Sequence, residues 1–189
     1  HMLTGELRRK CEVITSVEIL TTASIEALQT FLEEHPIYID TAALDNAVEF
    51  SDELGIRYRI QSTSEDLFAR DLLLTTGSET HLEALASIQE DLPSLASETA
   101  IYEALGLAYI EPELREGAEE IRCVQNGQLP ALITFADLKG TLHNHSTYSD
   151  GVHSLEQMAT YCKTELGLEY FGICDHSKTA VYAGGLSIE

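Results

Sequence analysis

Residues 138–151 have the sequence LKGTLHNHSTYSDG, and residues 169–177 have the sequence EYFGICDHS. The first stretch is typical of a short strand that runs, after His145, into a polar loop. The second is typical of a buried strand followed at once by Asp175-His176. Between them, Ser154 begins an amphipathic helix. This order predicts a β-α-β unit with parallel strands, and ligands of parallel α/β sheets gather at the carboxyl ends of the strands.

The polar residues at these strand ends have the chemistry of metal ligands. His143 and His145 alternate with Asn144, so on a regular strand both imidazoles point to one face, where they can chelate one cation or serve two adjacent cations. Asp150 lies in the loop that follows, and His176, at the end of the next strand, is expected to enter the same site. We therefore predict a metal site made of His143, His145, Asp150 and His176.

The neighbours of these residues leave alternatives open. Taken alone, Asp150 is as typical of a turn as of a metal ligand, and Gly151 allows the tight turn that would bring the carboxylate inward. Asp175 is predicted to orient an imidazole in the second shell of the site rather than to bind the metal. His153 is predicted to be an exposed loop residue. With histidine and carboxylate ligands, zinc, manganese and iron are all admissible, and such ions would catalyse phosphate-ester hydrolysis.

Charge and composition exclude several classes of function. The 189 residues include 11 basic and 32 acidic side chains, a net charge of -21, which argues against strong nucleic-acid binding by this stretch alone. The sequence contains no run of 18 or more apolar residues that would predict a membrane span, and its N-terminus does not resemble a secretory signal. We therefore expect a cytoplasmic protein. The four cysteines are widely and irregularly spaced, which predicts reduced structural thiols. Residues 1–2 resemble the remnant of a tag.

The fold class predicted for the whole chain is α/β. Strands are predicted at residues 12–20, 37–39 and 56–60, whereas residues 42–54 are ambiguous between helix and strand. Among these strands, helices are predicted to begin at Ser24 and Ser64. An acidic helical part follows, with helices predicted to begin at Ser78, Ser97 and Pro112, the last of them running to Asn126.

The stretches 138–151 and 175–177 closely resemble the start of a PHP domain, a family of metal-dependent phosphoesterases. The resemblance implies a (β/α) barrel that binds up to three metals and hydrolyses phosphate esters. It also implies that further ligands of the family, a glutamate, more histidines and a final Asp-x-His, lie outside this sequence. The chain is then a fragment of a longer protein, with little or no catalysis of its own.

The upstream part resembles the bacterial family X DNA polymerases, which carry a PHP domain at the C-terminus. The stretches that carry the resemblance are 5–12, Thr76-Gly77-Ser78 and, most closely, 101–116, IYEALGLAYIEPELRE. They imply a partial palm at residues 3–75, a helical thumb at 76–136 and the start of the PHP domain at 137–189. The thumb resembles a shortened form of the family's, with residues missing between His81 and Ser97.

The resemblance also locates departures from the family. The palm aspartates that hold catalytic magnesium correspond to Ser16, Glu18 and Arg59, and an arginine there would repel the ion. Leu74-Thr75 replaces an aromatic-rich pair that lies against the incoming nucleotide. These departures predict a palm and thumb without polymerase chemistry.

Three functions are compatible with the sequence. In the first, the longer protein is a metal-dependent phosphoesterase, either a 3′–5′ exonuclease or a phosphatase, whose partner is a phosphate ester such as DNA. In the second, residues 3–136 form a non-catalytic scaffold or interaction module. In the third, the protein is still an active repair polymerase, which the loss of the carboxylates opposes.

Overall fold

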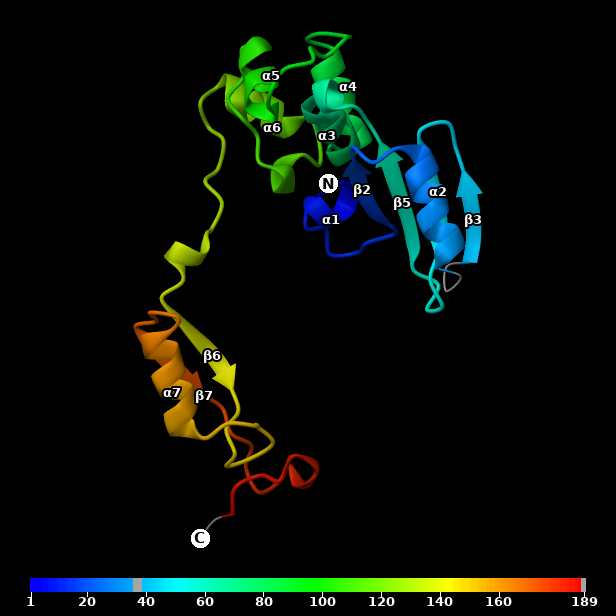
Figure 1. Cartoon of the computed structure of the whole chain (residues 1–189). Coiled ribbons are helices and arrows are strands. Elements are labelled where there is room, and N and C mark those ends of the chain that lie inside the picture. Colours follow the sequence, from blue (N-terminus) through cyan, green and yellow to red (C-terminus); the bar gives the residue numbers. More distant parts are fainter. Residues whose placement is uncertain (36–38, 188–189) are drawn as a thin grey trace. The chain divides into compact units, whose positions relative to one another are not determined.

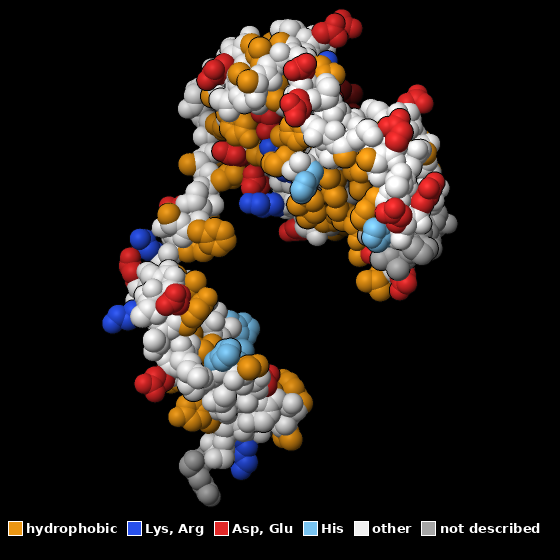
Figure 2. Space-filling model, in the orientation of Figure 1, with side chains coloured by type: hydrophobic (Ala, Val, Ile, Leu, Met, Phe, Trp, Pro, Cys, Tyr) orange, Lys and Arg blue, Asp and Glu red, His pale blue; other side chains and the backbone are white. Residues whose placement is uncertain are grey.

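The computed structural model describes residues 1–35 and 39–187, which form two compact units, His1–Pro130 and Ala131–Glu189 (Figure 1). Both units contain helices and strands, so the α/β class predicted from the sequence is confirmed. Each described helix is too short or too polar to cross a membrane. Acidic side chains clearly outnumber basic ones on the face shown in Figure 2, as the net charge of -21 requires.

The first unit begins with a five-stranded sheet in the order β1-β2-β5-β4-β3. Its strands are β1 (Met2–Leu3), β2 (Val17–Thr21), β3 (Ile39–Ala43), β4 (Ala47–Ser51) and β5 (Arg57–Ser62). Strands β2 and β5 run parallel, and the other neighbours are antiparallel. Helix α2 (Ile25–Glu34) lies across one face (Figure 1) and buries Leu32 against Val48 and Phe50. The hydroxyl of Ser24 caps this helix, as predicted, by accepting a hydrogen bond from the amide of Ala27.

The rest of the first unit is helical. The helices are α1 (Gly5–Arg8), α3 (Phe68–Thr76), α4 (Glu79–Ala86), α5 (Glu98–Ala104) and α6 (Glu119–Gln125). Ser78 and Ser97 cap α4 and α5, as their spacing predicts. A hydrophobic core joins α3, α4, α5 and α6 through residues that include Leu73, Leu85 and Ile101. The helix predicted to begin at Ser64 begins instead with a 3-10 turn, Glu65–Leu67, which leads into α3.

A buried polar network runs through this core. The carboxylate of Glu98 accepts hydrogen bonds from Arg8 (2.9 and 2.6 Å) and from Arg115 (2.6 Å). Arg115 is completely buried, and its guanidinium lies 5.4 Å from the ring centre of Tyr102 and 5.3 Å from that of Tyr109. Burial raises the pKa of Glu98, but the bonds from the two arginines outweigh this and hold the pKa below its ordinary value. Glu98 therefore stays ionised and balances part of the buried arginine charge.

The second unit contains the predicted β-α-β unit. Strand β6 (Gly140–Asn144) and strand β7 (Tyr170–Ile173) pair in parallel and are joined by helix α7 (Leu155–Thr164). Ser154 and Gln157 form a reciprocal capping box at the start of α7. The unit also contains two 3-10 turns, Phe135–Asp137 and Val181–Ala183. The compact unit begins at Ala131, slightly before the boundary predicted at residue 137.

Several sequence predictions in the first unit are corrected. The strand predicted at residues 12–20 begins only at Val17, because Thr15 is bound through its amide and hydroxyl to Glu6 (2.6 and 2.8 Å). The ambiguous stretch 42–54 contains strand β4. The helix predicted from Pro112 to Asn126 is broken after the turn Pro112–Leu114, where buried Arg115 leaves helical geometry. Of the strand predicted at 37–39, residues 37 and 38 lie outside the described residues.

Two corrections concern the second unit and its thiols. Strand β7, expected to be buried, exposes Tyr170 and Ile173, because it lies in a sheet of only two strands. The four cysteines are free thiols, but only Cys162 is buried, and Cys174 is exposed rather than packed in a core.

The buried network predicts that Glu98→Gln destabilises the first unit strongly. The substitution leaves the buried Arg115 guanidinium without a charged partner, which typically costs about 3–5 kcal/mol. Urea denaturation followed by circular dichroism measures the free energy of unfolding. The matched control is Glu119→Gln, in an exposed pair with Arg122 at 3.0 Å, where we expect a change below about 0.5 kcal/mol. Equal effects of the two variants would contradict this prediction.

Candidate metal centre

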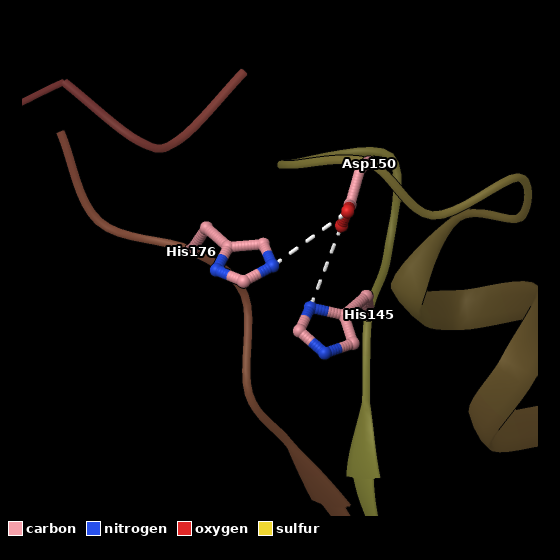
Figure 3. Close-up of side chains that lie close together, drawn as sticks. All are labelled: His145, Asp150 and His176. Carbon is pink, nitrogen blue, oxygen red and sulfur yellow. Dashed lines mark ion pairs between the residues drawn. The ribbon is translucent and has the colours of Figure 1, made fainter. Parts of the chain in front are cut away.

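Three of the predicted ligands lie together at the carboxyl ends of β6 and β7. The ligand atoms of His145, Asp150 and His176 all lie within 4.8 Å of one another (Figure 3). Asp150 lies between the two imidazoles, with Oδ1 3.5 Å from Nδ1 of His145 and Oδ2 3.6 Å from Nε2 of His176. The imidazole rings of the two histidines are stacked, with centroids 4.6 Å apart. Histidine side chains are visible together on the second unit in Figure 2.

The two separations between the Asp150 carboxylate and the imidazole nitrogens suit a bound divalent ion. An ion about 2.0–2.1 Å from each of two ligand atoms, at a tetrahedral angle, holds those atoms roughly 3.4 Å apart. The carboxylate–imidazole separations of 3.5 and 3.6 Å are close to that value and too long for hydrogen bonds. Nδ1 of His145 is moreover buried and has no hydrogen-bond partner among the described residues. A buried ring nitrogen left unsatisfied in this way is suited to bind a cation.

His143 lies beside this cluster but outside it. Its ring centroid is 5.2 Å from that of His145. The prediction that His143 and His145 alternate along a regular strand is wrong. The pairing of β6 and β7 shifts register between Thr141 and Asn144, and His143 has a φ of +61°. The side chain of Asn144 bridges the irregularity by donating a hydrogen bond to the carbonyl of Gly172 (2.9 Å).

The loop that carries Asp150 is folded around Ser146. The carbonyl of Ser146 accepts hydrogen bonds from the amides of Ser149 (3.0 Å) and Gly151 (2.9 Å). A side chain at Gly151 would collide with the backbone carbonyl of His145, so the glycine is needed for close approach of the chain. This close approach, rather than the tight turn expected from the sequence, is the reason for a glycine at position 151. His153 is exposed, as predicted, and Tyr182 lies edge-on to His176 with the ring centroids 6.0 Å apart.

Asp175 contacts this loop rather than an imidazole nitrogen. Its carboxylate accepts hydrogen bonds from the amide and hydroxyl of Ser146 (2.7 and 2.5 Å) and from the hydroxyl of Ser149 (2.6 Å). Burial raises the pKa of Asp175, but these hydrogen bonds outweigh it and hold the pKa below its ordinary value. Ser146 and Ser149 were not predicted as site residues, and the sequence signals them only by their positions next to His145 and Asp150.

Of the three positions linked above to the palm, Glu18 and Arg59 lie on the sheet of the first unit, and Ser16 immediately precedes β2. Glu18 on β2 and Glu49 on β4 both lie opposite Arg59 on β5, in the register of the strands. Arg59 forms an ion pair with Glu49, and the hydroxyl of Ser16 donates a hydrogen bond to Glu18 (3.1 Å). Arg59 and Glu18 line a cavity of about 360 Å³, together with residues that include Arg9 and Ser78.

No protein-family model matches the chain. The chain is 30% identical over 208 residues to a protein from Bacillus subtilis (strain 168) described as "DNA polymerase/3'-5' exonuclease PolX". The similarity covers 98% of this chain and 36% of the relative, so the chain spans about a third of the length of the curated relative that it matches. Similarity along nearly the whole chain supports a relationship with the family X DNA polymerases.

Proposed function

We propose that the second unit is the metal-binding part of a phosphoesterase, as its resemblance to the start of a PHP domain implies. The observation that carries the proposal is the group His145, Asp150 and His176, with the buried, unsatisfied Nδ1 of His145 facing Asp150. His143 is proposed as a further ligand of the complete centre, because its ring lies 5.2 Å from that of His145. Zinc, manganese and iron all suit these ligands.

The substrate class that we propose is a phosphodiester, with DNA as the first candidate. The name of the Bacillus relative includes a 3′–5′ exonuclease, an activity that cleaves phosphodiester bonds. Since the net charge of -21 opposes strong binding of DNA by this stretch, the contacts that hold the polymer are proposed to lie elsewhere in a longer protein.

The residues of the centre have separate tasks in this proposal. His145, Asp150 and His176 would hold the metal, and the side chains of Asp150 and His176 are partly exposed, at 48% and 30%, which leaves a phosphate oxygen access to the site. When bound, the metal would act as a Lewis acid on the phosphoryl group and lower the pKa of bound water. The carboxylate of Asp150 would supply negative charge that balances part of the charge of a bound cation.

For residues 3–136, nearly all of them in the first unit, we propose a palm-like part at residues 3–75 and a thumb-like part at 76–136, without polymerase activity. The observation that favours a non-catalytic module is Arg59, whose guanidinium pairs with Glu49 and lies opposite Glu18 in the sheet. A fixed cation at this position opposes the binding of magnesium by the neighbouring carboxylates. Ser16 adds no charge that could offset it.

We predict that the chain binds a divalent metal through the proposed ligands. In a zinc titration of the purified chain against a chromophoric chelator, His145→Ala and His176→Ala should weaken binding by more than the ~10–100-fold typical of an outer-shell loss. His153→Ala, in the same unit but exposed, is the control and should bind like the unmodified chain. No binding by the unmodified chain, or equal losses in all three variants, would argue against the centre.

A second prediction concerns the first unit. The test uses a variant that carries His145→Ala and His176→Ala, so that the proposed metal centre is removed. Electron paramagnetic resonance of added Mn²⁺ should then detect no ion bound at the palm-like sheet, because Arg59 repels it. The combined substitutions Ser16→Asp, Glu18→Asp and Arg59→Asp should create a Mn²⁺ site there. Tight Mn²⁺ binding before these substitutions, or robust primer extension by the unmodified chain, would refute the non-catalytic proposal.

A further inference from the structure

We propose that Asp175 is a positioning residue that sets the geometry of all three candidate ligands by holding the loop 146–151, and that it does not itself bind the metal. The proposal rests on the metal-binding function proposed above and goes further by assigning this role to Asp175. It also replaces the expectation that this carboxylate orients an imidazole.

The first observation is the number and kind of hydrogen bonds on one carboxylate. Oδ1 of Asp175 accepts from the amide of Ser146 and the hydroxyl of Ser149, at 2.7 and 2.6 Å. Oδ2 accepts from the hydroxyl of Ser146 at 2.5 Å. Hydrogen bonds to an ionised carboxylate are shorter and stronger than those between neutral groups. Ser146 is completely buried, so it depends on these partners to satisfy its polar atoms.

The second observation is the place of these groups in the chain. Each candidate ligand stands next to a member of the hydrogen-bonded group: His145 precedes Ser146, Asp150 follows Ser149, and His176 follows Asp175. One carboxylate therefore ties together the backbone at all three ligands. It does so across the ends of two strands, because Ser146 follows β6 and Asp175 follows β7.

The loop itself carries this restraint to Asp150. The hydroxyl of Ser146, held by Asp175, also accepts a hydrogen bond from the amide of Tyr148 at 3.1 Å. The carbonyl of Ser146 binds the amides on both sides of Asp150, those of Ser149 and Gly151. The position of the Asp150 backbone thus follows from that of Ser146, and the position of Ser146 follows from Asp175.

The chemistry requires an aspartate rather than an asparagine at this position. Three donors converge on the side chain, and an ionised carboxylate accepts on both oxygens. An amide would turn an NH₂ group toward at least one donor and lose a hydrogen bond. The three hydrogen bonds occupy most of the acceptor sites of the carboxylate, and only Oδ2 keeps room for a further partner.

The test compares Asp175→Asn with Asp137→Asn in the 189-residue chain. Asp137 is a matched control, since it accepts hydrogen bonds from the amide and hydroxyl of Thr134, both at 2.8 Å, in the same unit but outside the site. Two quantities are measured: zinc affinity by chelator competition, and amide hydrogen exchange of residues 146–151 without metal. For Asp175→Asn we expect a loss of zinc affinity of about 10–100-fold and faster exchange of the loop. Asp137→Asn should change neither.

Other outcomes would overturn the proposal. Unchanged zinc affinity in Asp175→Asn would remove the link to the ligands. Lost affinity with unchanged exchange of the metal-free loop would make Asp175 a ligand instead. If the unmodified chain binds no zinc, the proposed function fails, and exchange alone then decides whether Asp175 holds the loop. Should Asp175→Asn fail to fold, Ser149→Ala removes one of the three bonds and should produce the same two changes to a smaller extent.

Discussion

Three short hydrogen bonds on the Asp175 carboxylate join the ends of two parallel strands, and the geometry of the candidate metal centre depends on them. Parallel pairing of β6 and β7 brings both carboxyl ends to one edge, where His145 and His176 lie with their rings stacked. Nδ1 of His145 and Nε2 of His176 approach the Asp150 carboxylate at 3.5 and 3.6 Å, which are separations that suit ligands of one cation.

In the first unit, the main polar contacts are ion pairs between arginine and glutamate side chains. Glu98 is buried between Arg8 and Arg115 and links α1 to the helical part. On the sheet, Arg59 lies opposite a glutamate on each neighbouring strand and pairs with one of them. The pairing of Arg59 is the observation on which the proposal of a non-catalytic module rests.

The parts of the fold that follow from local pattern were predictable. Ser24, Ser78, Ser97 and Ser154 cap helices where their spacing with apolar residues places them. Features set by distant contacts were not. Strand β2 begins late because Glu6 binds Thr15, and the helix after Pro112 breaks where Arg115 turns into the core. In the site, the residue types predicted the cluster of His145, Asp150 and His176. The displacement of His143 and the partners of Asp175 depend on a register shift and on loop folding.

The most direct test of the metal centre is zinc-edge X-ray absorption of the zinc-loaded chain, beside His145→Ala. The proposed ligands predict a first shell of nitrogen and oxygen at about 2.0–2.1 Å, with the outer scattering of imidazole, and a clear loss of that shell in the variant. A sulfur shell at about 2.3 Å would instead place the ion on a thiol such as the exposed Cys174. That result, or a spectrum unchanged by His145→Ala, would contradict the centre described here.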